Sequence, residues 1–89
     1  MEIEYTLEAQ EDLQYWQQQG TDAIKRKISQ LIENISKTPF SGIGKPEPLK
    51  YELAGSWSRR IDRKNRIIYE ISDNIIYILS MKGHYNGSK

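Results

Sequence analysis

Cysteine is absent from this sequence, and histidine occurs only once, as His84. Disulfide bonds and thiolate metal sites are therefore excluded, and one histidine cannot build a metal site by itself. Long hydrophobic runs are missing too, since no apolar stretch approaches the ~20 residues that cross a bilayer. We therefore expect no metal, no cofactor and no membrane contact, and any catalysis should rely on acid–base or electrostatic effects.

Size and the N-terminal sequence limit the domain organisation and the location of the protein. The 89 residues leave room for one domain with one modest core, which we place at residues 1–89. The first ten residues, MEIEYTLEAQ, carry acids where a secretory signal needs positive charge. We therefore expect a cytoplasmic protein.

Charge is distributed unevenly along the chain, although the net charge is only +1. Residues 1–20 contain five acids and no base, whereas residues 45–66 contain seven bases and three acids. The basic segment suits a polyanion such as nucleic acid, but a solvated charged surface explains the same pattern. Charge alone leaves both interpretations open.

In the first half of the chain, the apolar pattern predicts a strand and then two helices. Ile3 and Tyr5 alternate with acids, and apolar residues then recur at helical spacing from residue 7 to about residue 18. Gly20 should end this helix, and Thr21 can cap a second helix that stops before Pro39. The second helix carries one apolar stripe, formed by Ile24, Ile28, Leu31, Ile32 and Ile35.

Strand signals dominate after SGIGKPEP, a loop rich in glycine and proline. Four β-branched or aromatic runs follow, at residues 51–54, 57–61, 67–71 and 75–81. The connections between them are short, which favours antiparallel hairpins. We therefore predict an α+β domain with both helices packed on one face of an antiparallel sheet of about five strands.

Two adjacent arginines in SWSRRID, Arg59 and Arg60, must point to opposite faces of their strand. If Trp57 and Ile61 mark the core side, Arg60 points to the open face. Arg59 then lies beside core residues, paired or at the rim of the sheet. Arg66 opens the next strand and should lie close to Arg60. Guanidinium groups suit phosphate recognition, although surface arginines in ordinary salt bridges are the alternative.

Glu47 lies between Pro46 and Pro48, so its backbone is stiff and its carboxylate is well placed for a general base. His84 follows the last strand and is the only side chain of a type that titrates near neutrality. Tyr85 beside it can stack on a nucleobase or close the edge of the core. An exposed loop glutamate and a terminal surface histidine remain the alternative interpretations.

Long strings of this sequence resemble one protein family. TPFSGIGKPEPLKYELAGSWSRRIDRKNRIIYEI, followed by the terminal GHY, is similar to the YoeB/Txe-type toxins of the RelE-like toxin–antitoxin superfamily. The resemblance extends from YWQ at residues 15–17 to Tyr85, which is most of the chain. It implies a RelE-like fold, with an N-terminal strand and a two-helix hairpin packed on an antiparallel sheet, and a YefM-like antitoxin as partner.

The resemblance also implies a ribosome-dependent, metal-free endoribonuclease that cleaves messenger RNA in the A site of the 70S ribosome. Matching the motifs assigns Glu47 as general base, Arg66 as the group that stabilises the transition state, and His84 as general acid. The supporting or RNA-binding positions are Lys50, Arg59, Arg60 and Tyr85. Two departures are Asn65, where many members have histidine, and residues 86–89, which continue beyond the usual terminal tyrosine.

Two other functional classes remain as alternatives. A non-catalytic module could hold RNA or an antitoxin, but such a module does not need both Glu47 and His84. A DNA-binding repressor subunit would need a basic helix in a helix-turn-helix, which the pattern does not predict, so DNA contact is expected only through the antitoxin. Homodimerisation stays open.

Overall fold

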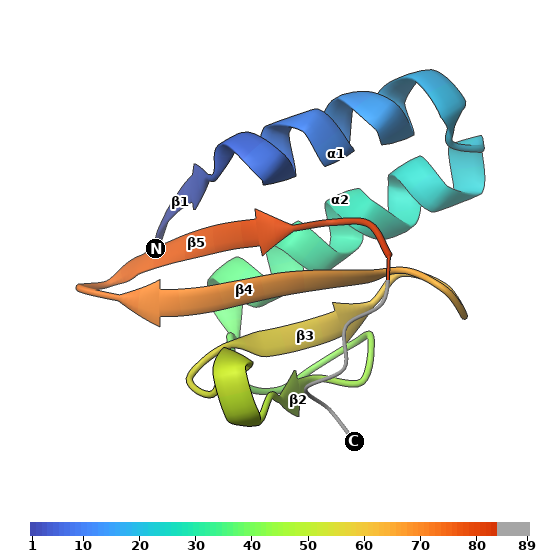
Figure 1. Ribbon diagram of the computed structural model, residues 1–89. Coiled ribbons are helices and arrows are strands. Elements are labelled where there is room, and N and C mark those ends of the chain that lie inside the picture. The colour runs from blue at the N-terminus through green and yellow to red at the C-terminus, as the bar shows by residue number, and fades with distance from the viewer. Residues whose placement is uncertain (84–89) are drawn as a thin grey trace.

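Residues 1–83 are described by a computed structural model in which two helices cover one face of a five-stranded sheet (Figure 1). The elements are β1 (Glu2–Tyr5), α1 (Leu7–Gln19), α2 (Asp22–Lys37), β2 (Glu47–Pro48), a 3-10 helix (Tyr51–Leu53), β3 (Trp57–Arg60), β4 (Arg66–Ser72) and β5 (Ile75–Ser80). The strands lie in the order β1-β5-β4-β3-β2. The predicted α+β fold is confirmed.

Both helices begin at threonine caps. The Thr6 hydroxyl accepts a hydrogen bond from the Ala9 N–H, and the Thr21 hydroxyl accepts one from the Ile24 N–H, each at 3.1 Å. These bonds satisfy N–H groups that the first turn of a helix leaves without partners. Gly20 ends α1 as predicted, so the hairpin turns within two residues.

The first strand departs from the predicted antiparallel arrangement. β1 runs parallel to β5, with Glu2 opposite Ile75 and Tyr5 opposite Ile78, while the other neighbouring pairs are antiparallel. No hairpin joins β1 to β5, because both helices and three strands separate them in sequence. Alternating polarity identifies which face of a strand is buried, but it does not give the direction of a strand without a hairpin partner.

The predicted strand at residues 51–54 is wrong. This segment forms a 3-10 helix with a bond from the Ala54 N–H to the Tyr51 carbonyl at 3.0 Å. Tyr51 is 73% exposed, so its side chain has no neighbouring surface to pack on as a strand residue would. The strand at this edge is instead β2, and its Pro48 is tolerated there because an edge strand has one unpaired side.

The core lies between the helices and the sheet. Ile28, Leu31 and Ile35 of α2 pack against the helix-facing side chains of the sheet, which include Ile67, Tyr69, Ile76 and Ile78. Ile68 is buried as well but lies outside this cluster, since alternation along β4 directs it to the opposite face together with Arg66. The sheet therefore separates an apolar interior from a face that can carry a functional site.

Candidate functional site

Three neighbouring strands bring charged side chains together on the face of the sheet that the helices leave open. Arg60 of β3 lies directly opposite Arg66 of β4, as the sequence predicted, and Glu47 of β2 lies opposite Ser58 of β3. The Arg66 Nη1 is 3.4 Å from the Glu47 Oε1 and 3.2 Å from the Ser58 Oγ. Residues distant in sequence thus form one cluster around the Arg66 guanidinium.

A shallow pocket of about 290 Å³ lies over this cluster, lined by Lys45, Pro46, Glu47, Arg60 and Arg66. Three bases and one acid give the pocket a positive field, which attracts anions. The Arg66 side chain is only 15% exposed, whereas that of Glu47 is 39% exposed. Charge interactions with the shielded guanidinium are screened less by salt than those at an open surface. The pocket is suited to a phosphate group beside a carboxylate.

Ser58 is a member of this site that the sequence interpretation did not single out. It is fully buried, and its hydroxyl lies within hydrogen-bonding distance of Arg66. Alternation along SWSRRID puts Ser58 on the same face as Arg60, and this signal could have identified it. Lys45, one of the seven bases of residues 45–66, also lines the pocket.

The remaining predicted residues are not all brought to the pocket. Lys50 is exposed and is not part of the pocket lining. His84 and Tyr85 lie outside the described residues. Gly83, immediately before His84, donates its backbone N–H to the Asn65 Oδ1 at 2.8 Å. Asn65 directly precedes Arg66, so Gly83, the last described residue, lies beside the start of β4.

The prediction that Arg59 is an RNA-binding residue requires a correction, because its side chain cannot touch RNA in this conformation. Its side chain has no exposed surface, and it lies on the helix-facing side of β3. The guanidinium donates hydrogen bonds to Asn34, Tyr69 and backbone carbonyls of the loop after α2. Arg59 is therefore an internal structural residue, while its neighbour Arg60 lines the pocket.

The turn before β4 is held by one carboxylate. The Asp62 Oδ1 accepts backbone hydrogen bonds from Lys64 and Asn65, both at 2.8 Å, and the Asn65 side-chain amide donates to the same group. Burial alone would raise the pKa of Asp62, but these hydrogen bonds and the Lys64 charge outweigh it, so the pKa lies below its usual range. This turn fixes the position from which Arg66 enters the site.

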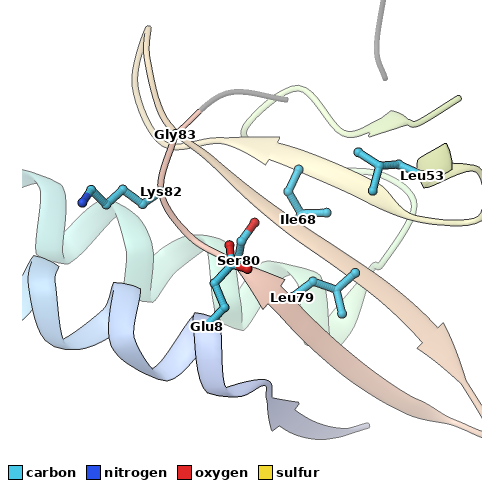
Figure 2. A pocket seen from close by; sticks show the side chains of 7 residues that line it. All are labelled: Glu8, Leu53, Ile68, Leu79, Ser80, Lys82 and Gly83. Carbon is cyan, nitrogen blue, oxygen red and sulfur yellow. The ribbon is translucent and has the colours of Figure 1, made fainter. Parts of the chain in front are cut away.

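A second pocket, also of about 290 Å³, lies beside the segment that leads to residue 84 (Figure 2). Leu53, Ile68 and Leu79 form its apolar part, and it is completed by Glu8, Ser80, Lys82 and Gly83. A register shift between β4 and β5 leaves Leu79 between the paired residues Ile78 and Ser80. Because Ile68 and Arg66 share one face of β4, an apolar surface adjoins the charged pocket.

Residues 1–83 contain neither a cluster of metal-binding side chains nor a membrane-spanning helix. Within residues 1–83, no group of three or more histidine, aspartate or glutamate side chains is placed to hold a metal ion. No helix of this range is long and apolar enough to cross a membrane.

Comparison with known proteins identifies the class to which this fold and site belong. The family model described as a YoeB-like toxin of bacterial type II toxin–antitoxin systems matches residues 5–85. Toxin YoeB of Escherichia coli strain K12 is 41% identical over 85 residues, covering 96% of this chain and all of the relative.

Solved structures agree with the sequence relatives. A YoeB/ParE toxin from Agrobacterium tumefaciens has a TM-score of 0.90 and 39% identity, covering 96% of this chain and all of that one. The toxin of a YoeB–YefM complex from Staphylococcus aureus has a TM-score of 0.83 and 41% identity, covering 96% and 98%. The protein is thus a toxin of a type II toxin–antitoxin system. Within that class, the chain belongs to the YoeB-like family.

Proposed function

We propose that this toxin is an endoribonuclease that cleaves messenger RNA in the A site of the 70S ribosome without a metal ion. The observation that carries the proposal is the placement of the Glu47 carboxylate 3.4 Å from the Arg66 guanidinium, in a pocket with two further bases. A carboxylate beside a phosphate-binding group is what intramolecular cleavage of RNA needs from an enzyme.

The reaction uses the nucleophile that RNA itself carries. Glu47 removes the proton of the ribose 2'-hydroxyl, and the 2'-oxygen attacks the adjacent phosphorus. Arg66 and Arg60 stabilise the negative charge that develops on the phosphoryl oxygens. The bond from phosphorus to the 5'-oxygen then breaks, and His84 donates a proton to that oxygen. The products are a 2',3'-cyclic phosphate and a free 5'-hydroxyl.

In the free protein, Glu47 and Arg66 pair with each other. A bound phosphate group competes with Glu47 for the guanidinium, because both are anions that suit the same donors. Binding of the substrate thereby turns the carboxylate from an ion-pair partner into a base that faces the ribose. Presentation of the message in a bent, in-line geometry by the ribosome supplies the remaining orientation.

The partner is an antitoxin of the YefM type, by analogy with the S. aureus YoeB–YefM complex. An amphipathic acidic segment fits this surface, since bases line one pocket and Leu53, Ile68 and Leu79 line the adjoining one. It would cover the groups that otherwise meet RNA phosphates, including Lys50, Arg60, Arg66 and His84. DNA contact comes only through the antitoxin, and a homodimer is proposed from the S. aureus YoeB dimer.

The proposed activity is tested by mapping the 5' ends of transcripts after brief expression of the toxin in bacterial cells. We expect new ends within translated messages that carry 5'-hydroxyl groups, and co-expression of the antitoxin should abolish them. The proposal is wrong if growth stops without new transcript ends, which would leave a toxin that binds but does not cut. New ends in RNA that is not being translated would instead contradict the dependence on the ribosome.

A further inference from the structure

Arg59 is a buried cation whose five guanidinium N–H groups are all used within the protein. The Nε donates to the Tyr69 hydroxyl at 3.0 Å, and the Nη1 donates to the Asn34 Oδ1 at 2.7 Å and the Ile43 carbonyl at 2.9 Å. The Nη2 donates to the carbonyls of Thr38 at 2.7 Å and Ser41 at 2.9 Å. All five acceptors are neutral, so hydrogen bonds rather than an ion pair compensate the buried charge.

Most of these acceptors belong to one segment, residues 38–44, between α2 and β2. Besides the three carbonyls bound by Arg59, the Pro39 carbonyl accepts a bond of 2.6 Å from the Tyr69 hydroxyl. Gly42 and Gly44 have φ values of +118° and +80°, and a Cβ at either position would collide with Asn34 or Leu31. Residues 38–44 (TPFSGIG) therefore surround one guanidinium with hydrogen-bond acceptors. Together with Asn34 and Tyr69 they form what we call the acceptor shell of Arg59.

This segment leads directly to the carboxylate of the pocket. The Gly44 carbonyl accepts a 2.6 Å bond from the Arg60 N–H, and Lys45 and Pro46 then join it to Glu47. Only two residues separate the fixed Gly44 from Glu47, and Pro46 restricts the backbone between them. The place of Glu47 opposite Arg66 thus depends on where residues 38–44 are held.

We propose that Arg59 is a positioning residue that fixes residues 38–44 and thereby holds Glu47 at Arg66. The inference rests on the proposed function in taking Glu47 as the general base. A guanidinium is suited to this task because its planar donors point in five fixed directions. A lysine ammonium has only three donors on a flexible stem, so it leaves two or more of the same oxygens without a partner.

Asn34 offers a matched pair of variants that changes the acceptor shell without altering Arg59. Its Oδ1 accepts from both Arg59 and the Ile43 N–H, the latter at 3.2 Å. Asn34→Asp keeps an oxygen at this position and adds a charge opposite to that of Arg59, whereas Asn34→Leu removes both bonds at similar volume. Arg59→Lys tests the guanidinium itself, and Ile28→Val serves as a control for lost stability in the helix-facing core.

The experiment measures single-turnover cleavage of ribosome-bound message by the full-length toxin, together with amide hydrogen exchange at Ile43 and Arg60. Asn34→Leu and Arg59→Lys should cleave on the order of 10- to 10²-fold more slowly at saturation, because small displacements of reacting groups are costly. The concentration of ribosome-bound message that gives half the maximal rate should not change. Both amides should exchange faster. Asn34→Asp should retain the cleavage rate and the protection of both amides.

The inference is overturned if folded Asn34→Leu cleaves at the wild-type rate. It is also overturned if Ile28→Val loses as much cleavage rate as Asn34→Leu when both lower the melting temperature equally. Equal losses in Asn34→Asp and Asn34→Leu also overturn it. If Arg59→Lys does not fold, the Asn34 pair still decides the outcome. Glu47→Gln is measured alongside these variants. If it cleaves normally, the assignment of the base fails. Unchanged exchange at Arg60 in Asn34→Leu separately refutes the role of Arg59, because Asn34 does not bond the Arg60 amide itself.

Discussion

The side-chain oxygen of Asn65 accepts a 2.8 Å hydrogen bond from the backbone N–H of Gly83. The amide nitrogen of the same side chain donates to both carboxylate oxygens of Asp62, at 3.1 and 3.2 Å. Asn65 therefore connects the turn between β3 and β4 to the segment that carries His84. The residue that departs from the family's common histidine is thus a structural link next to the site.

Removing this link should impair cleavage more than folding. We expect Asn65→Ala to lower single-turnover cleavage about fivefold, since one hydrogen bond contributes about 1 kcal/mol. Asn65→His should retain activity, because one imidazole nitrogen can accept from Gly83 while the other donates to Asp62. An Asn65→Ala variant that cleaves as fast as the wild type would show that Gly83 needs no such anchor.

A second anchor for the same segment comes from α1. The Trp16 Nε1 donates to the Met81 carbonyl at 2.7 Å, and the Met81 N–H donates to the Asp12 Oδ2 at 2.9 Å. Trp16→Phe leaves a buried carbonyl without its partner, at a cost of about 1–3 kcal/mol. The melting temperature should fall by about 4–8 °C for each kcal/mol in a domain of this size. Gln18→Ala, at an exposed position of the same helix, is the control. If Trp16→Phe and Gln18→Ala melted at the same temperature, the role of Trp16 would be contradicted.

Sequence patterns predicted the helices well because their signals are local. Helical spacing, Thr21 and Gly20 placed the ends of both helices within about a residue, as the observed caps confirm. Residues 51–54 were mispredicted because strand propensity reflects packing on a neighbouring surface, which the exposed Tyr51 does not have. Local pattern could not reveal this, since the missing neighbour is a property of the assembled sheet.

The sequence predicted which face of the sheet the site residues occupy, but not which residues they contact. Alternation assigned Arg60 to the open face and Arg59 to the core side, and the structure confirms both. The five acceptors of Arg59 come from three separate parts of the chain, so no spacing rule predicts them. The contact between Glu47 and Arg66 depends on the register of β2 on β3, which the misplaced strand at residues 51–54 had obscured.

The pH dependence of stability should report on the turn at Asp62. The pKa of this carboxyl is lowered in the folded state because the hydrogen bonds from Lys64 and Asn65 outweigh the effect of burial. A lowered pKa gives stability that is present above the unfolded value, about 3.9, and is lost as the pH falls through the folded value. In urea unfolding, the free energy of unfolding should therefore fall more between pH 7 and pH 2.5 for the wild type than for Asp62→Asn. An equal fall in the two proteins would contradict the role given to the lowered pKa of Asp62.

Residues 86–89 should be dispensable for toxicity. The sequence Asn-Gly-Ser-Lys has no apolar side chain that could anchor it, and it follows the last residue with a proposed role in RNA binding. A chain that stops at Tyr85 should arrest growth and cleave ribosome-bound message as the full chain does. Loss of cleavage by a truncated protein with an unchanged circular dichroism spectrum would mean that these residues help to place His84.

The central claim is that Glu47, Arg66 and His84 act together in one chemical step, and single-turnover cleavage of ribosome-bound message tests it most directly. Glu47→Gln, Arg66→Ala and His84→Gln should each keep the fold and antitoxin binding but lose ~10²-fold or more in rate. Double variants should lose less than the product of the single effects, because the groups act as a unit. Near wild-type rates for both Glu47→Gln and His84→Gln would contradict the assignment of base and acid.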